Sequence, residues 1–308
     1  MEMKLTADNK KLLWILIIAL VSLIFYSNLF AGGIRLLHEK SFDVNPGEIL
    51  ELEAESGDVI LTTWDNNEVY VKVYGNSKAE DYIDFYFERT SEGVKILAEK
   101  EGGSFFNWFT SIQMKFEIKV PREFNVDLQT SGGDVSVDEL TGELLLKTSG
   151  GDIDLTNTNG ELQARTSGGD IDVQNHNGES QLKTSGGHII CSEMKGNLDV
   201  GTSGGDIKLK SIDGWIEAHT SGGDVILDYN GDNKGVDLTT SGGDIEVYLP
   251  SDFKADVDLK SSGGYIDCDY SMSKTYRVKS NQLEADFNGG GERLHCRTSG
   301  GDVIVKEK

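Results

Sequence analysis

The sequence predicts an all-β protein built as a parallel β-solenoid with 18 residues per coil, preceded by one transmembrane helix. Three observations predict this fold class. The motif Thr-Ser-Gly-Gly-Asp recurs, with its Thr at every 18th residue from Thr130 to Thr220. Apolar residues in each unit alternate at a spacing of two, the period of a strand with one buried face. The chain has 37 glycines and only three prolines, which is typical of many tight turns between hydrogen-bonded strands.

The N-terminal segments are predicted to be a cytoplasmic end (residues 1–11) and a signal-anchor helix (residues 12–34). Leu12–Phe30 is 19 residues long without a charge, enough to cross a lipid bilayer core of about 30 Å. Three lysines precede it, so residues 36–308 are expected outside the membrane of a single-pass protein. A cleaved signal peptide and a buried core helix are the alternatives, although the apolar stretch exceeds a usual signal-peptide core.

Residues 36–128 predict an irregular β part that caps the N-terminal end of the solenoid. Segments such as GEILELEA and EVYVKVYG alternate well but lack the 18-residue period. Ser56-Gly57-Asp58-Val59 looks like a degenerate copy of the repeated corner.

Residues 129–308 predict the solenoid itself, with a C-terminal cap. Each unit carries two short strands, such as those around Ile153/Leu155 and Leu162/Ala164, and Ser180 is a polar exception at an inward position. Seven residues separate the last inward residue of one strand from the first inward residue of the next. Because seven is odd, a continuous strand would place these two residues on opposite faces, so the chain must turn a corner between them. An antiparallel meander would leave the apolar face uncovered, whereas a solenoid buries it coil against coil. The paired glycines are expected to supply positive φ at the corner. Leu249-Pro250, the insertion around 271–282 and the segment from Asn288 are together expected to close the stack.

The negative charge of the predicted exported part excludes anionic partners. Residues 36–308 carry 25 basic and 50 acidic side chains, and such a surface repels nucleic acid and anionic lipid head groups. The charge either keeps a long β protein soluble or attracts cations and cationic partners.

One carboxylate position repeats from coil to coil and is the best candidate for a site. This Asp ladder consists of Asp134, Asp152, Asp170, Asp206, Asp224 and Asp244, with His188 interrupting it. Carboxylates about 4.8 Å apart repel one another, and Ca²⁺, which prefers oxygen ligands, would relieve the repulsion. The alternative is a solvated acidic stripe that discourages aggregation, and no other cofactor is expected.

A second candidate is a cluster of aromatic residues in the N-terminal part, namely Phe105, Phe106, Trp108 and Phe109. The cluster would bind an envelope protein or surface ligand, or rest in a membrane interface. The alternative is that it packs over the first coil as a cap.

Several segments resemble a known family of bacterial envelope proteins, the "putative adhesin" or toast-rack β-strand-repeat domains of unknown function. The resemblance rests on SGDVILTTWDNNEVYVKV (56–73), IKVPREFNVDLQTSGGDV (118–135), LPSDFKADVDLKSSGGYI (249–266) and NGGGERLHCRTSGGDVIV (288–305). The resemblance implies a right-handed β-helix-like scaffold. It suggests adhesion only through the family's name, and it implies a link to envelope-stress systems for some relatives. It transfers no catalytic residues.

The expected function is a non-catalytic, membrane-anchored surface module for adhesion or protein interaction. A cation-binding or stress-sensing element is the alternative. A polysaccharide-active β-helix enzyme is a weaker one, because the Asp positions are equivalent rather than differentiated into acid and base, and because no G-x-S-x-G, H-E-x-x-H or P-loop motif occurs.

Overall fold

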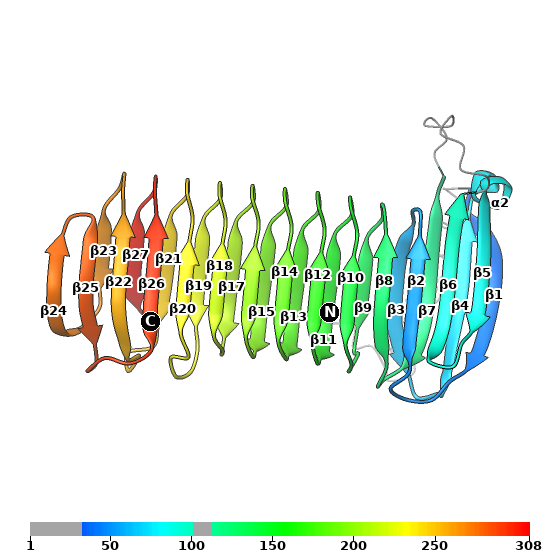
Figure 1. The fold of residues 1–308 in the computed structure, drawn as a ribbon, viewed down its shortest axis with the longest axis horizontal. Coiled ribbons are helices and arrows are strands. Elements are labelled where there is room, and N and C mark those ends of the chain that lie inside the picture. Colours follow the sequence, from blue (N-terminus) through cyan, green and yellow to red (C-terminus); the bar gives the residue numbers. More distant parts are fainter. Residues whose placement is uncertain (1–32, 101–111) are drawn as a thin grey trace, which may run out of the picture.

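The computed structural model describes residues 33–100 and 112–308 as two facing sheets of 13 and 14 strands. Figure 1 shows them as a long two-layered stack. The expected cytoplasmic end and nearly all of the expected helix at 12–34 lie outside the described residues. No helix within the described ranges is long and apolar enough to span a membrane. The predicted all-β solenoid is confirmed.

The central strands pair in parallel with an offset of 18 residues, for example Ile153 with Ile171 and Leu162 with Ser180. The offset rises to 20 residues at the last central pairing in each sheet. We define a coil as one strand of the 14-stranded sheet, the corner after it and the next strand of the 13-stranded sheet. The central coils comprise β8 (Asn125–Thr130), β9 (Val135–Asp138), β10 (Leu144–Lys147), β11 (Ile153–Asn159), β12 (Leu162–Arg165), β13 (Ile171–Asn177), β14 (Ser180–Lys183), β15 (Ile189–Lys195), β16 (Leu198–Gly201), β17 (Ile207–Ile212), β18 (Ile216–His219), β19 (Val225–Tyr229), β20 (Val236–Thr239) and β21 (Ile245–Leu249).

At the N-terminal end, the first coil of the sequence is not the outermost coil. The elements here are β1 (Arg35–Asp43), β2 (Ile49–Ala54), β3 (Asp58–Trp64), β4 (Glu68–Gly75), α2 (Ser77–Tyr82), β5 (Ile83–Arg89), β6 (Gly93–Lys100) and β7 (Met114–Pro121). Coil β2–β3 pairs with β8–β9 on one side and with β6–β7 on the other. Antiparallel strands then cover the end, β1 with β4 in one sheet and β5 with β6 in the other.

The C-terminal end repeats this arrangement. Its strands are β22 (Ala255–Ser261), β23 (Ile266–Asp269), β24 (Met272–Lys279), β25 (Gln282–Phe287), β26 (Arg293–Thr298) and β27 (Val303–Glu307). Coil β26–β27 lies between β20–β21 and β22–β23. Of the segments expected to close the stack, the insertion around 271–282 lies at the end, in the hairpin β24–β25 (Figure 1). The expectation is wrong for the segment from Asn288, which is inserted as the penultimate coil.

The core lies between the two sheets, where inward side chains from successive coils form apolar rows. We call the turn after each strand of the 13-stranded sheet, such as the turn between β11 and β12, the second corner. One row of inward side chains at this corner contains polar members: Leu140, Thr158, His176, Met194 and Ile212, all buried. The His176 imidazole is hydrogen-bonded to the Thr158 hydroxyl (2.9 Å). Its Nε2 and the hydroxyl of buried Ser180 have no hydrogen-bond partner among the described residues. Burial lowers the pKa of His176 from 6.5 to about 4, because the charged form loses its hydration.

The Thr-Ser-Gly-Gly-Asp corner is held by its buried Thr. The Thr166 hydroxyl donates to the carbonyl of Gly151 on the preceding coil (2.8 Å) and accepts from the backbone N–H of Gly169 (3.3 Å). These two bonds pair buried backbone groups that would otherwise have no hydrogen-bond partner in the turn. The same two bonds recur at Thr184, Thr202 and Thr220.

The second glycine of the corner is required by close packing between coils. A Cβ at Gly169 would lie 2.0 Å from the Gly151 carbonyl oxygen, whereas one at Gly168 would meet nothing closer than 3.7 Å. Among the glycine pairs of these corners, only Gly133 has a left-handed φ. The expectation that the paired glycines supply positive φ is therefore wrong for most coils. Left-handed residues instead recur at the other corner, at Glu139, Asn157, Asn175, Glu193 and Ser211.

Candidate functional site

The Asp ladder has a structural role at the corner. The Asp152 carboxylate accepts a hydrogen bond from the backbone N–H of Asp170 on the next coil (2.7 Å), and Asp206 accepts from Asp224 in the same way (3.0 Å). Each carboxylate therefore accepts a hydrogen bond from the N–H group at the start of a strand, which the backbone hydrogen bonds between strands leave without a partner. Asx side chains pair N–H groups in turns in the same way.

The ladder is longer than the sequence indicated and follows the order of coils in space. Asp58 accepts from the N–H of Asp134 at one end. At the other end Asp244 accepts from Asp302, and Asp302 accepts from Tyr265. Sequence reasoning missed Asp302 because the inserted coil β26–β27 breaks the 18-residue spacing. The corner predicted at Ser56–Val59 is present, since Asp58 is the first member.

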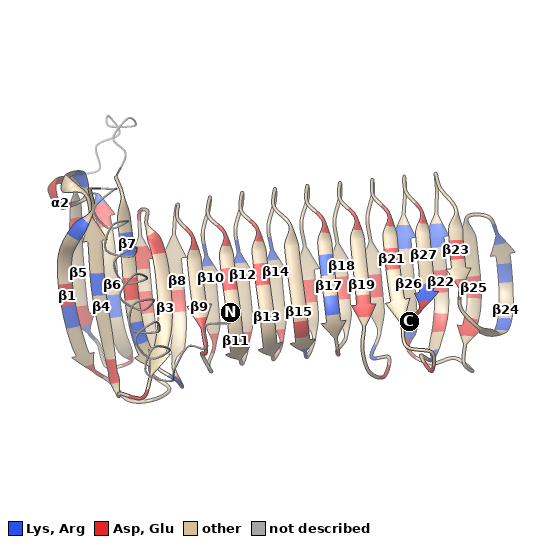
Figure 2. Ribbon diagram, turned by 180° about the vertical axis from the view of Figure 1, so that it is seen from behind, with Lys and Arg blue, Asp and Glu red and all other residues tan. Residues whose placement is uncertain are grey.

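One oxygen of each ladder carboxylate is thus engaged in a backbone hydrogen bond. Within the two described ranges, no three His, Cys, Asp or Glu side chains are grouped closely enough to hold a metal ion. On the neighbouring outward position the pKa values of Asp154 and Asp172 are raised by partial burial, and nearby carboxylates add to the shift at Asp154. Figure 2 shows acidic residues recurring along the molecule.

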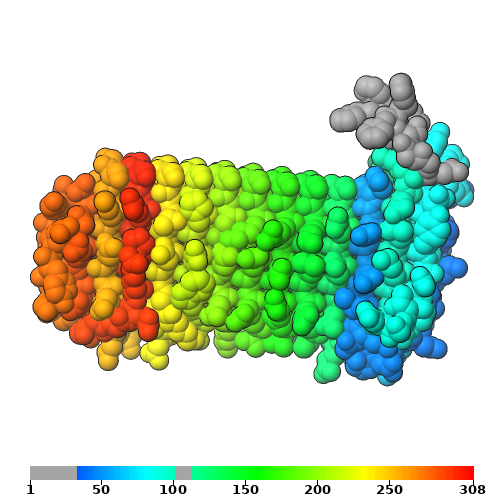
Figure 3. All heavy atoms as spheres, viewed as in Figure 1, coloured from blue at the N-terminus to red at the C-terminus, as the bar shows by residue number. Residues whose placement is uncertain are grey.

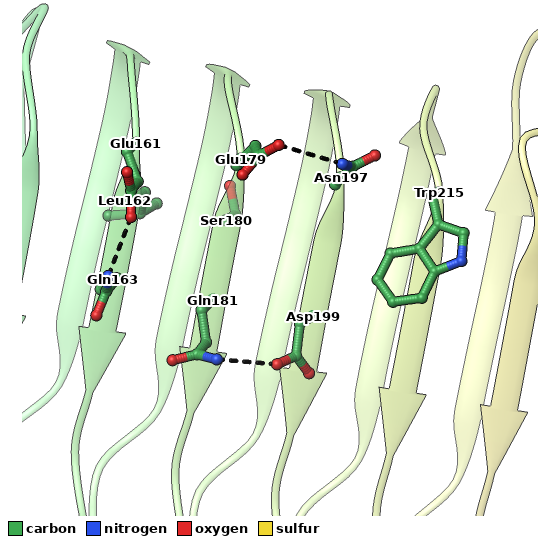
Figure 4. A pocket seen from close by; sticks show the side chains of 9 residues that line it. All are labelled: Glu161, Leu162, Gln163, Glu179, Ser180, Gln181, Asn197, Asp199 and Trp215. Atoms are coloured by element: carbon green, nitrogen blue, oxygen red, sulfur yellow. Dashed lines mark hydrogen bonds between the residues drawn. The ribbon is translucent and has the colours of Figure 1, made fainter.

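The other predicted site, the aromatic cluster of Phe105, Phe106, Trp108 and Phe109, lies outside the described residues. The structure shows instead a groove that sequence reasoning did not single out. It runs across the outward face of β12, β14 and β16 and has a volume of about 310 Å³. We name it the Trp215 groove, because the indole of Trp215 stands at one end of it (Figure 4).

Two rows of side chains line the Trp215 groove. The row at the second corner is Glu161, Glu179, Asn197 and Trp215, and the row on the strands is Gln163, Gln181 and Asp199. The rows follow the parallel register, in which Gln163 pairs with Gln181 and Gln181 with Asp199. The rows therefore present amide and carboxylate groups at intervals of about 4.8 Å.

Hydrogen bonds between these side chains hold the groove in one arrangement. Gln181 donates to Asp199 (3.1 Å), Gln163 donates to Glu161 (3.1 Å) and Asn197 donates to Glu179 (3.3 Å), as Figure 4 shows. Asp199 also forms an ion pair with Lys183. Each amide or carboxylate retains further donor or acceptor positions, so the groove presents both hydrogen-bond donors and acceptors at the surface.

Trp215 is positioned by the coil that follows it. Its side chain lies against Gly235, where a Cβ would stand 2.8 Å from the indole Cδ1. The loop before Gly235 is organised by buried Tyr229, whose hydroxyl donates toward the carbonyl of Gly214 (2.9 Å) and accepts from the N–H of Lys234 (3.1 Å). The loop accounts for the looser spacing between Thr220 and Thr240. Trp215 remains 38% exposed, with part of its ring open to solvent.

A basic row lies at the other end of the same strands. Lys147, Arg165 and Lys183 are in register on β10, β12 and β14. They line a second groove, of about 380 Å³, beside the Ser residues of the corners. Lys183 pairs with Asp199, whereas Lys147 and Arg165 have no carboxylate within 4.0 Å among the described side chains. The two grooves on this face therefore differ in charge.

The fold and its site define a class, that of β-solenoid scaffolds with a side-chain groove along the stack. The model of the Toastrack family DUF4097 matches residues 48–306. The chain therefore belongs to this family of unknown function. The sequence matches no protein of curated function.

Several solved structures are similar to this chain at low sequence identity. One is described as a "putative adhesin" from Bacteroides fragilis, with 13% identity, a TM-score of 0.40, and coverage of 89% of this chain and 97% of that one. A "putative lipid binding protein" from Parabacteroides distasonis has 12% identity, a TM-score of 0.47 and coverage of 89% and 98%. A "putative adhesin" from Parabacteroides merdae has 10% identity, a TM-score of 0.38 and coverage of 89% and 97%.

Proposed function

We propose that the protein is a non-catalytic module of the cell envelope, anchored in the membrane through residues 12–34. In this proposal residues 36–308 stand outside the membrane and present a long repetitive surface to a surface ligand or another envelope molecule. The single observation that carries the proposal is the Trp215 groove on an outward sheet face. No described element packs over that groove, and the space-filling view of the molecule shows this side as a long surface (Figure 3).

Two features favour a binding scaffold over an enzyme or a cation site. The repeated carboxylates have equivalent backbone partners, whereas glycoside hydrolysis needs two carboxyl groups with different protonation states. The same backbone bonds occupy one oxygen of each Asp in the ladder, which gives the ladder a role that needs no cation. The proposed function requires no cofactor.

Topology and contact can be tested together in intact cells. The full-length protein would carry a photo-crosslinking residue in place of Gln181, in the groove, or in place of Tyr86, an exposed position near the N-terminal end of the same sheet. We expect a membrane-impermeant amine reagent added to intact cells to label lysines within residues 36–308, and crosslinking to a ligand from position 181 only. Labelling of these lysines only after cell lysis, or equal crosslinking from both positions, would contradict the proposal.

A further inference from the structure

The Trp215 groove continues beyond its first three coils. A neighbouring hollow is lined by Ile49, Asn125, Glu143 and Leu145, and it shares Glu161 and Gln163 with the groove. Together they follow the second-corner side of the sheet from β2 to β18. Seven coils at about 4.8 Å per step make a trough of roughly 29 Å. The trough runs along the solenoid axis, because each lining row is built from one side chain per coil.

The chemistry of the trough favours hydroxyl groups as ligands. Carboxylate oxygens of Glu161 and Glu179 accept hydrogen bonds, while the amides of Gln163 and Gln181 both donate and accept. Planar amides and carboxylates in pairs suit adjacent hydroxyl groups, and bonds to a charged acceptor are the stronger ones. Trp215 supplies a flat ring whose negative face attracts the polarised C–H groups on one side of a sugar ring.

Charge decides which kind of polymer fits. Three carboxylates, Glu161, Glu179 and Asp199, line the Trp215 groove, and the whole chain has a formal net charge of −23. Asp199 is paired with Lys183 and Arg165 donates to Gln181 at 2.9 Å, whereas Glu161 and Glu179 have no cation within 4.0 Å among the described side chains. These two carboxylates and the charge of the whole molecule disfavour an anionic polymer. A neutral polymer of hydroxyl-bearing rings meets no such barrier.

We propose that the Trp215 groove binds a neutral polysaccharide that lies along the solenoid axis, one sugar ring per coil or nearly so. This proposal deepens the proposed function by naming the ligand class of the surface module. A step of about 4.8 Å between coils is close to the length of one pyranose unit in an extended chain, so successive sugars lie over successive coils. Trp215 stacks on a ring at the end of the bound segment.

The test is a calorimetric titration of the full-length protein, kept in a detergent without a sugar head group. The probes are cellohexaose and chitohexaose as neutral β-linked hexasaccharides, polygalacturonate as an acidic polymer, and hexalysine as a cationic peptide. We expect at least one neutral hexasaccharide to bind. Trp215→Ala should weaken that binding about tenfold, because the aromatic ring that stacks on the terminal sugar is lost, and the double variant Gln163→Ala/Gln181→Ala should also weaken it.

Tyr86→Ala is the matched control, because it removes another exposed aromatic from the same sheet outside the trough. It should bind like the unaltered protein, and all variants should keep their unfolding midpoints. Binding of neither hexasaccharide, unchanged binding by Trp215→Ala, or binding of hexalysine or polygalacturonate alone would overturn the proposal. These results are separate from the cell experiment, since a surface module with another ligand would still crosslink from position 181.

Discussion

The Nδ1 atom of His188 accepts a hydrogen bond from the backbone N–H of Asp206, with 2.9 Å between the two nitrogens. His188 thus occupies the ladder position that aspartates fill on the neighbouring coils, and it provides the same acceptor without the negative charge. The bond requires the tautomer with its proton on Nε2. The interruption of the Asp ladder in the sequence is therefore no interruption of the hydrogen-bonded ladder, which shows that the acceptor, rather than the charge, is what the corner needs.

Two different substitutions of one ladder carboxylate separate its role as a hydrogen-bond acceptor from its negative charge. Asp170 accepts from the N–H of His188. Asp170→Ala should lower the free energy of unfolding by about 1 kcal/mol, the usual net value of one hydrogen bond. Asp170→Asn keeps an acceptor oxygen and should cost much less. Urea unfolding of the two variants measures the difference, and equal losses would show that the acceptor role is wrong.

The paired glycines of the corner provide a matched pair of variants. Gly169→Ala should destabilise the protein by about 3 kcal/mol or more, because the new Cβ would overlap the Gly151 carbonyl and the coils would have to separate. Gly168→Ala has room for its Cβ and should change stability by no more than about 0.5 kcal/mol. Thermal unfolding of both variants tests this, and similar melting temperatures would contradict the packing argument.

His176 should make the fold sensitive to acid. Its folded-state pKa of about 4 lies below the ordinary value of 6.5, so the unfolded chain binds a proton more readily. The stability from neutral His176 is complete above pH 6.5 and is lost as the pH falls toward 4, by about 3 kcal/mol in total. His176→Met should flatten the dependence of unfolding free energy on pH in this window, whereas His219→Met, at an exposed position, should not. Equal slopes for the two variants would refute the assignment.

The inserted coil predicts an unusual result of truncation. β22 pairs only with β25 and β26, and β23 only with β27, among the described strands. Deleting residues 288–308 should therefore release residues 250–287 from the stack, although these residues are still present. Limited proteolysis followed by mass spectrometry should find trimming back to near Leu249. A resistant segment 250–287 would show that it can dock directly onto β20–β21.

The regular part of the fold follows from the sequence because the period fixes the pairing. Residues 18 apart carry the same pattern, so the registers of Ile153 with Ile171 and of Leu162 with Ser180 could be predicted. The spatial order of the end coils could not, because the inward faces of all coils are alike and sequence does not tell which one lies beside β21. The role of Gly169 also depends on a contact between coils rather than on its own φ.

The Trp215 groove was missed for a related reason. Its members are ordinary polar residues on separate coils, and only their stacking forms a surface. Trp215 was the available signal, since it stands at a corner position where Glu161, Glu179 and Asn197 stand on the preceding coils. Nearly all of the expected anchor at 12–34 and the whole of Phe105–Phe109 lie outside the described residues.

The inserted coils at the two ends also bear on how the solenoid forms and comes apart. Central coils join neighbours only 18 or 20 residues away, whereas β3 pairs with β9 about 76 residues on, and β21 with β27 about 58 residues on. Contacts of such separation form late, because longer loops must close first. Once formed, they leave no coil at either end that is both last in the chain and last in the stack. Unravelling from the C-terminus must therefore extract β27, which is paired with both β21 and β23, so we expect this inserted coil to slow unfolding from that end.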